Sequence, residues 1–164
     1  MTIYIGADHR GFKLKEMIKE FLKNRGYNVL DVGDTFYDEN DDYPDFAVNV
    51  AEKIGVEYEN SRGILVCASG VGMSVVANRF PRVRAGLIMT PDQAFDARND
   101  DDSNVLVLPA NYITSDVAKR ILITWLETPF SGEEKFRKRL AKIDQIDEQI
   151  SNAIRSQIGE GEVR

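Results

Sequence analysis

The chain has 164 residues, 43% hydrophobic and 29% charged, which is typical of one globular domain. No run approaches the roughly 18 apolar residues of a membrane span, and a net charge of -6 disfavours non-specific nucleic-acid binding. A lone Cys67 and a lone His9 exclude an internal disulfide and a Cys/His zinc cluster. The chain opens on an apolar segment without a secretory leader pattern, which predicts a cytoplasmic protein.

The first elements alternate between strand and helix. Residues 4–7 form a short apolar run, and the apolar positions between Phe12 and Leu22 then follow the three-and-four spacing of an amphipathic helix. Gly26 is placed to end this helix, and residues 27–32 have the apolar character of a second strand.

The middle and the end of the chain repeat this alternation. The acidic stretch at residues 34–45 predicts a surface loop, in which Pro44 is placed to begin a helix. Residues 63–67 are apolar without alternation, which is typical of a strand covered on both faces, and a helix is expected over residues 70–78. The remaining elements are strands at residues 85–89 and 104–108 and helices at residues 91–98, 115–127 and 131–149.

Five strands separated by helices predict a three-layer, Rossmann-like α/β domain with a five-stranded parallel sheet flanked by helices. We assign residues 1–149 to this domain and expect the polar residues 150–164 to fray or to dock on a partner subunit. Ligands of such sheets bind beyond the carboxyl ends of the strands. We place four polar segments there, namely residues 8–9, 33–34, 67–72 and 100–103.

The segment Cys67-Ala68-Ser69-Gly70-Val71-Gly72 joins a predicted strand to a predicted helix. Its glycines and the positive end of the helix allow backbone N–H groups to face an oxyanion or a phosphate. Similar turns also serve only as tight packing joints, so the pattern leaves both interpretations open. Cys67 could likewise be a small buried hydrophobe, although a thiol beside a helix N-terminus is favoured as thiolate and can act as a base.

Asp8 and His9 follow the first predicted strand. They could cap the next helix, or Asp8 could accept hydrogen bonds from sugar hydroxyls while His9 donates to a ring oxygen or a phosphate. The triplet Asp100-Asp101-Asp102 is either a solvated acidic turn, a magnesium-binding feature or a set of carboxylates that raise one another's pKa. Lys135 and Arg139, four residues apart on a predicted helix, share a face that either is solvated or clamps a phosphate.

Several ordered motifs together resemble the ribose-5-phosphate isomerase B and galactose-6-phosphate isomerase family over residues 3 to about 143. The motifs are Gly6-Ala7-Asp8-His9-Arg10-Gly11-Phe12-Lys13-Leu14-Lys15, Asp42-Tyr43-Pro44-Asp45, Gly63-Ile64-Leu65-Val66-Cys67 with Ser69-Gly70-Val71-Gly72-Met73-Ser74, and Ala77-Asn78. The resemblance implies a homodimer, or a tetramer, with active sites at the subunit interface. It also implies metal-independent, cofactor-free isomerisation of a sugar phosphate through an enediolate, with ribose 5-phosphate to ribulose 5-phosphate as the expected reaction.

The resemblance also assigns roles to individual residues. Cys67 would be the base that moves a proton between C1 and C2, and Ser69 would join the backbone amides in stabilising the oxyanion. Asp8 and His9 would hold the sugar. The substrate-binding turn would comprise Ala68, Ser69, Gly70, Val71 and Gly72.

The sequence departs from the family at the ring-opening and phosphate-binding positions. Asp100 and Asp101 replace a His-Asn pair, so Asp100 would have to be protonated to open the sugar ring. The family's phosphate-binding arginine falls on Asn111. The family's Arg-His pair in the last helix falls on Lys135-Phe136, which leaves Arg139 as the preserved arginine. An alternative function is therefore a catalytically weakened relative that binds a sugar or sugar phosphate as a sensor or partner subunit. A nucleotide-binding domain is disfavoured because the G-x-G-x-x-G spacing is absent after the first strand.

Overall fold

A computed structural model describes residues 1–161 of the chain. The chain divides into two compact units, one formed by Met1–Phe130 and one that begins at Ser131. The first unit contains all the described strands and five helices, and the second contains one helix. Among the helices that the structure describes, none is long and apolar enough to cross a membrane.

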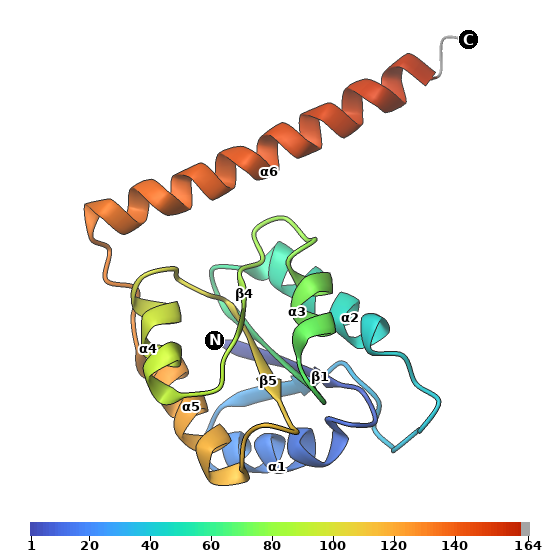
Figure 1. Cartoon of the computed structure of the whole chain (residues 1–164), viewed down its shortest axis with the longest axis vertical. Helices are drawn as coiled ribbons and strands as arrows, with labels where there is room; N and C mark the ends of the chain where they lie inside the picture. Colours follow the sequence, from blue (N-terminus) through green and yellow to red (C-terminus); the bar gives the residue numbers. More distant parts are fainter. Residues whose placement is uncertain (162–164) are drawn as a thin grey trace. The chain divides into compact units, whose positions relative to one another are not determined.

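The first unit is built on a five-stranded sheet in the order β2-β1-β3-β5-β4, in which all neighbouring strands are parallel (Figure 1). Its strands are β1 (Thr2–Ala7), β2 (Asn28–Asp31), β3 (Ser61–Cys67), β4 (Ala85–Leu87) and β5 (Val105–Pro109). The predicted five-stranded parallel sheet is thus confirmed. β4 ends two residues before the predicted boundary at residue 89.

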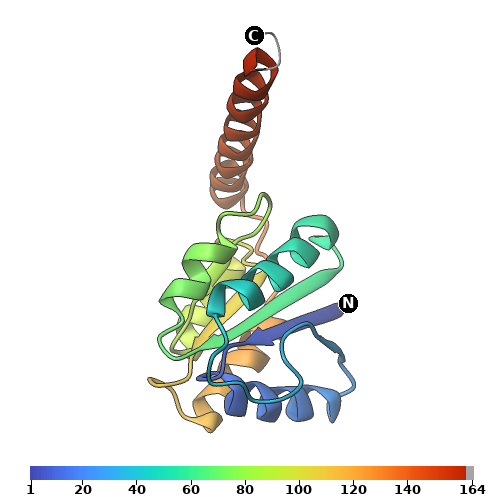
Figure 2. The same cartoon turned by 90° about the vertical axis from the view of Figure 1, so that its right-hand side faces the viewer.

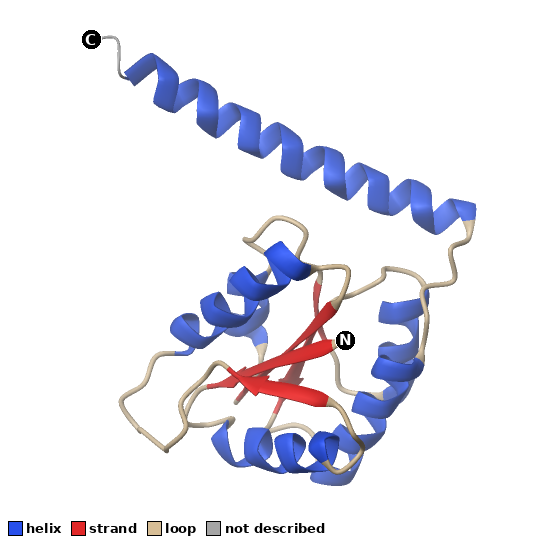
Figure 3. Ribbon diagram, turned by 180° about the vertical axis from the view of Figure 1, so that it is seen from behind, coloured by secondary structure: helices blue, strands red, loops and turns tan. Residues whose placement is uncertain are grey.

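Helices cover both faces of this sheet, as Figures 2 and 3 show. One core cluster joins α1 (Phe12–Lys23), α4 (Pro91–Asn99) and α5 (Ser115–Glu127) to the sheet, and a second joins α2 (Tyr43–Glu57) and α3 (Val71–Ala77) to its other face. Successive side chains of a strand point to opposite faces, so Ile64 and Val66 enter the first cluster while Leu65 and Cys67 enter the second. The predicted three-layer fold is confirmed.

The parallel strands give the sheet two chemically distinct edges. The carboxyl edge lies beyond Ala7, Cys67, Leu87 and Pro109, and the amino edge lies before Ser61 and the first residues of the other strands. Strands β1 and β3 are neighbours, with Ala7 paired to Val66. From β1 the chain proceeds to β2 on one side, and from β3 it proceeds to β4 and β5 on the other. The carboxyl edge between β1 and β3 is therefore the topological switch point, where ligands of such folds bind.

The second unit is dominated by α6 (Glu134–Gly161), a single continuous helix. The prediction ended this helix at residue 149, but it continues through residues 150–161, which belong to the expected tail. The side chains of Ile143, Ile146, Ile150 and Ile154 are exposed along it. Their spacing of three or four residues places them on one face. The docking of the tail stays a prediction, and residues 162–164 lie outside the described part of the chain.

Candidate active site

Asp8 and Cys67 meet at the switch point. They follow the paired residues Ala7 and Val66 of β1 and β3, and the Cys67 thiol donates a hydrogen bond to Asp8 Oδ2 over 2.9 Å. Asp8 is 4% exposed and Cys67 is 7% exposed, so this contact is shielded from water. The sheet thus brings together a nucleophilic sulfur and a carboxylate that are far apart in the sequence.

The structure corrects the expected protonation state of Cys67. Burial raises the pKa of the thiol to about 11, and the hydrogen bond and negative charge of Asp8 act in the same direction. The backbone hydrogen bonds of Gly70 and Ala68 favour the thiolate, but their effect is smaller. The predicted stabilisation of the thiolate by the helix N-terminus is therefore outweighed, and Cys67 rests as a thiol.

The carboxylate of Asp8 is positioned by the start of α1. The backbone N–H of Gly11 donates to Asp8 Oδ1 over 2.8 Å, so Asp8 both contacts the thiol and closes the turn into α1. A side chain at Gly11 would lie 2.1 Å from the carbonyl oxygen of Val66. This residue must therefore be glycine for α1 to approach β3, a role that sequence reasoning missed.

The turn after Cys67 requires glycine at two positions. Gly70 has a φ of 74°, in the left-handed region, and a Cβ there would lie 2.6 Å from Leu87 Cδ1. A Cβ at Gly72 would lie 2.6 Å from the ring of Tyr43, so the aromatic residue that begins α2 packs directly against the turn. The glycines are therefore needed for shape, which confirms that the turn approaches its neighbours closely.

Polar groups border this turn on the carboxyl edge. The Ser69 side chain is exposed, and its Oγ accepts a 3.4 Å hydrogen bond from the N–H of Val71. The N–H of Asn111, which follows β5, donates to the carbonyl of Ala68 over 3.0 Å. Asn111 therefore lies at the same edge as Cys67, as the resemblance to the sugar-phosphate isomerases implied.

His9 is held by an acidic residue that the sequence did not single out. His9 Nδ1 lies 2.6 Å from Asp41 Oδ1, and the ring of Tyr37 meets the imidazole edge-on. This contact leaves Nε2 as the nitrogen available to a ligand. Asp41 and Tyr37 belong to the loop between β2 and α2, where no periodic pattern could have indicated their partners.

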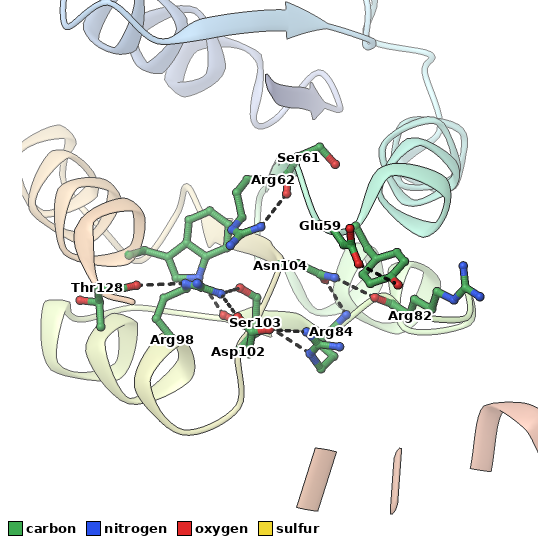
Figure 4. A network of polar contacts seen from close by, with 12 residues as sticks. Glu59, Ser61, Arg62, Arg82, Arg84, Arg98, Asp102, Ser103, Asn104 and Thr128 are labelled. Atoms are coloured by element: carbon green, nitrogen blue, oxygen red, sulfur yellow. Dashed lines mark hydrogen bonds and ion pairs between the residues drawn. The ribbon is translucent and has the colours of Figure 1, made fainter. Parts of the chain in front are cut away.

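The structure does not place Asp100 beside Cys67. Residues 100–103 precede β5, so they lie at the amino edge, and the expectation that they follow a strand's carboxyl end is wrong. Five residues of β5 separate the two edges by about 16 Å. Asp100 accepts a 2.8 Å hydrogen bond from Asn99 Nδ2, and Asp101 is exposed. Figure 4 shows the polar network that surrounds Asp102 at this edge.

The magnesium interpretation of the aspartate triplet gains no support from the structure. Among the side chains that the structure describes, no group of three or more His, Cys, Asp or Glu residues is arranged to hold a metal ion. The Asp102 carboxylate instead pairs with Arg84 and Arg98, at 2.8 and 2.7 Å.

Lys135 and Arg139 share a face of α6, as predicted. Lys135 Nζ lies 4.4 Å from the centroid of the Phe136 ring, and Arg139 Cζ lies 5.5 Å from the same centroid. Lys135 also pairs with Glu133 over 3.1 Å. Two cations on one ring could approach a single phosphate.

Comparison with known proteins decides the family. Residues 3–143 match the family described as Ribose/Galactose Isomerase. The chain belongs to this family. It is 37% identical over 148 residues to the probable ribose-5-phosphate isomerase B of Mycoplasma genitalium, covering 90% of this chain and 97% of that protein. It is also 37% identical over 147 residues to ribose-5-phosphate isomerase B of Escherichia coli, covering 89% of this chain and 96% of the relative.

Solved structures of the ribose/galactose isomerase family share the fold. The crystal structure of the Mycoplasma genitalium enzyme with bound ribulose-5-phosphate superimposes with a TM-score of 0.87, covering 90% of this chain and 96% of that one. The sequence identity of that pair is 37%. The family match ends at residue 143, whereas α6 continues to Gly161.

Proposed function

We propose that this chain interconverts ribose 5-phosphate and ribulose 5-phosphate through an enediolate. The thiol–carboxylate pair of Cys67 and Asp8 at the switch point, beside a glycine-rich turn, is the observation that carries the proposal. Relatives named ribose-5-phosphate isomerase B, each covered over more than nine tenths of its length, support the assignment of a sugar-phosphate isomerase.

The proposed reaction moves one proton between two carbons of the sugar. Asp8, 2.9 Å from the sulfur, accepts the thiol proton, and the Cys67 thiolate then removes the proton from C2 of the open-chain aldose. The electron pair passes into the C1–C2 bond, and the C1 oxygen becomes an oxyanion. Ser69 and the N–H groups of residues 70–72 stabilise this charge. Cys67 returns a proton to C1, the C2 hydroxyl loses its proton to become the ketone, and the C1 oxyanion is protonated.

The remaining site residues are proposed to come from a second copy of the chain. One protomer cannot bring Cys67 and Asp100 to one sugar, because they lie at opposite edges of the sheet. A homodimer, or a tetramer of such dimers, would place Asp100 and Asp101 of one copy beside Cys67 of another, with Lys135 and Arg139 on the phosphate. The exposed isoleucines of α6 support this assembly, since an apolar helix face of this kind is typical of an interface. The residues 150–161 would dock on that partner.

No cofactor or metal takes part in the proposed reaction, and a cytoplasmic location remains a prediction from the sequence. The site is chemically complete for proton transfer, since a base, an acceptor for its proton and oxyanion donors are all supplied by side chains and backbone. Addition of a metal chelator should leave turnover unchanged in the assay described next.

A coupled assay tests the proposed substrate. Ribose 5-phosphate, allose 6-phosphate and galactose 6-phosphate would be compared with their unphosphorylated sugars, and we expect the highest kcat/KM for ribose 5-phosphate. Asn111 in place of an arginine weakens phosphate recognition, so the preference for phosphorylated sugars should be moderate. Binding of ribose 5-phosphate without any turnover would refute the proposal and support a sensor or partner subunit instead.

The pH dependence of wild-type activity follows from the raised pKa of Cys67. At rest the thiol holds its proton up to a pKa of about 11, and Asp8 accepts that proton during the reaction, so wild-type kcat/KM should change less than about threefold between pH 7 and pH 10. Asp8→Asn removes this acceptor, so the thiol must lose its proton to solvent, and kcat/KM of the variant should rise about tenfold per pH unit until the pH reaches the pKa of its thiol. Steady-state kinetics at a series of pH values measure both profiles. A wild-type kcat/KM that rises about tenfold per pH unit above pH 7 would contradict the role of Asp8 as proton acceptor.

A further inference from the structure

The turn between α4 and β5, residues 100–104, carries Asp100 and is built around Asp102. Asp102 has a φ of 44°, in the left-handed region that residues with side chains rarely adopt. Such a conformation persists only where the surrounding structure holds it in place. The contacts of Asp102 therefore decide the shape of the turn that presents Asp100.

Two arginines from different elements hold Asp102. Arg98 of α4 donates from Nη1 to Asp102 Oδ1 over 2.7 Å, and Arg84, directly before β4, donates from Nη2 to Asp102 Oδ2 over 2.8 Å. Arg84 Nε also donates to the Asp102 carbonyl oxygen over 3.0 Å. We call these three residues the arginine clamp, and Figure 4 shows them converging on the turn.

The clamp is anchored in the core of the first unit. Arg98 is 5% exposed, and besides Asp102 it donates to the carbonyls of Ser103, over 2.7 Å, and Thr128, over 3.3 Å. Ser103 Oγ in turn accepts a 2.7 Å hydrogen bond from Nε1 of the buried Trp125. The turn is thereby connected to α4, to β4 and to the end of α5. Charge-assisted hydrogen bonds of this kind are shorter and roughly twice as strong as neutral ones.

Asp100 takes no part in these contacts, although it is two residues from Asp102. Its carboxylate accepts a hydrogen bond from the neighbouring Asn99 amide. The arginines neutralise one of three consecutive carboxylates, which limits the repulsion that the turn would exert on a negatively charged sugar phosphate. The clamp therefore separates a structural aspartate from one that is available for chemistry.

We propose that Arg84 and Arg98 are positioning residues of the isomerase, which hold Asp102 so that Asp100 reaches the ring oxygen of the sugar bound at Cys67 of a second copy. This inference rests on the proposed function. It assigns the clamp to the ring-opening step alone, before the proton transfer at Cys67 begins.

The ring-opening step can be isolated by comparing isomerisation of ribose 5-phosphate with hydrogen exchange at C1 of ribulose 5-phosphate. Ribose 5-phosphate is a closed ring that must open, whereas ribulose 5-phosphate cannot form a five-membered ring, because its O5 carries the phosphate. In Arg98→Lys and Asp102→Asn, we expect kcat with ribose 5-phosphate to fall about 10- to 100-fold through misplacement of Asp100. Exchange of the C1 hydrogen of ribulose 5-phosphate with D₂O passes through the enediolate and returns to ribulose 5-phosphate without a ring step, so its rate should fall less than about threefold.

Arg62→Lys is the matched control. Arg62 lies at the same edge but donates to the carbonyl of Ser61, so its replacement should leave both isomerisation and C1 hydrogen exchange within about twofold of wild type. Thermal unfolding of each variant verifies that it is folded at the assay temperature. If Arg98→Lys does not fold, the test relies on Asp102→Asn, which keeps the size of the side chain.

A double-mutant cycle tests whether the clamp acts through Asp100. In the Asp100→Asn background, adding Arg98→Lys should cause no further loss with ribose 5-phosphate. Losses that multiply in the cycle, or an equal loss in the C1 hydrogen exchange of ribulose 5-phosphate, would overturn the positioning role while leaving the proposed function intact. Absence of wild-type turnover in either direction would overturn the proposed function and the role of the clamp with it.

Discussion

Cys67→Ala is expected to lower kcat for ribose 5-phosphate by about 10²- to 10⁴-fold, the usual contribution of a positioned acid–base group. The substitution removes the Cys67 thiol and leaves Asp8 without the donor 2.9 Å away. The oxyanion turn and the proposed phosphate contacts remain, so KM should change much less than kcat. Initial rates in a coupled assay measure the effect.

Val66→Ala is the matched control for Cys67→Ala. Val66 is the preceding residue of β3 and is fully buried on the opposite face of the sheet. Removing its methyl groups should lower the stability by roughly 1–3 kcal/mol while kcat stays within a few-fold of wild type. If Cys67→Ala retained normal turnover, or if Val66→Ala lost as much activity, the assignment of Cys67 as the base would be wrong.

Mixing two inactive variants is expected to restore activity, because the proposed site draws residues from two copies of the chain. Cys67→Ala and Asp100→Asn each damage a different edge of the sheet. After the subunits are exchanged, mixed dimers contain one site with both wild-type residues and one with neither. For random pairing of two such variants, about a quarter of wild-type activity should return.

The control for this experiment mixes Cys67→Ala with Asp8→Asn, which alters the same edge. Mixed dimers then carry one defect in each site, so no activity should return. No recovery in the Cys67→Ala and Asp100→Asn mixture despite demonstrated subunit exchange would show that one protomer supplies both residues. Recovery in the control would show that Cys67 and Asp8 do not act together in one site.

The alternation of strands and helices could be predicted from the sequence because it depends on local patterns. The unbroken apolar run before Cys67 indicates a strand covered on both faces, and Ile64 and Leu65 do enter opposite core clusters. The end of α6 was harder to predict. Polar residues after Ile150 weaken the amphipathic pattern, but neither glycine nor proline interrupts residues 134–158, and the helix continues.

The details of the site depend on contacts between distant parts of the chain. The pKa of Cys67 is raised because burial and Asp8 act together, and the sequence does not show that β1 lies beside β3. Asp41 reaches His9 from an irregular loop in the same way. Asp100 was assigned to the carboxyl edge although it precedes β5, and only the direction of that strand separates it from Cys67.

The most direct test of the central claim is isomerisation of ribose 5-phosphate in D₂O, with the product analysed by NMR. In the proposed mechanism the proton taken from C2 resides on the Cys67 sulfur, where it exchanges with solvent. The account therefore predicts deuterium at C1 of ribulose 5-phosphate. With Cys67→Ala, both product formation and deuterium incorporation should be much slower than with the wild type. Complete conversion without deuterium would contradict proton transfer through a thiol that exchanges with solvent, and deuterium incorporation at the wild-type rate by Cys67→Ala would exclude Cys67 as the base.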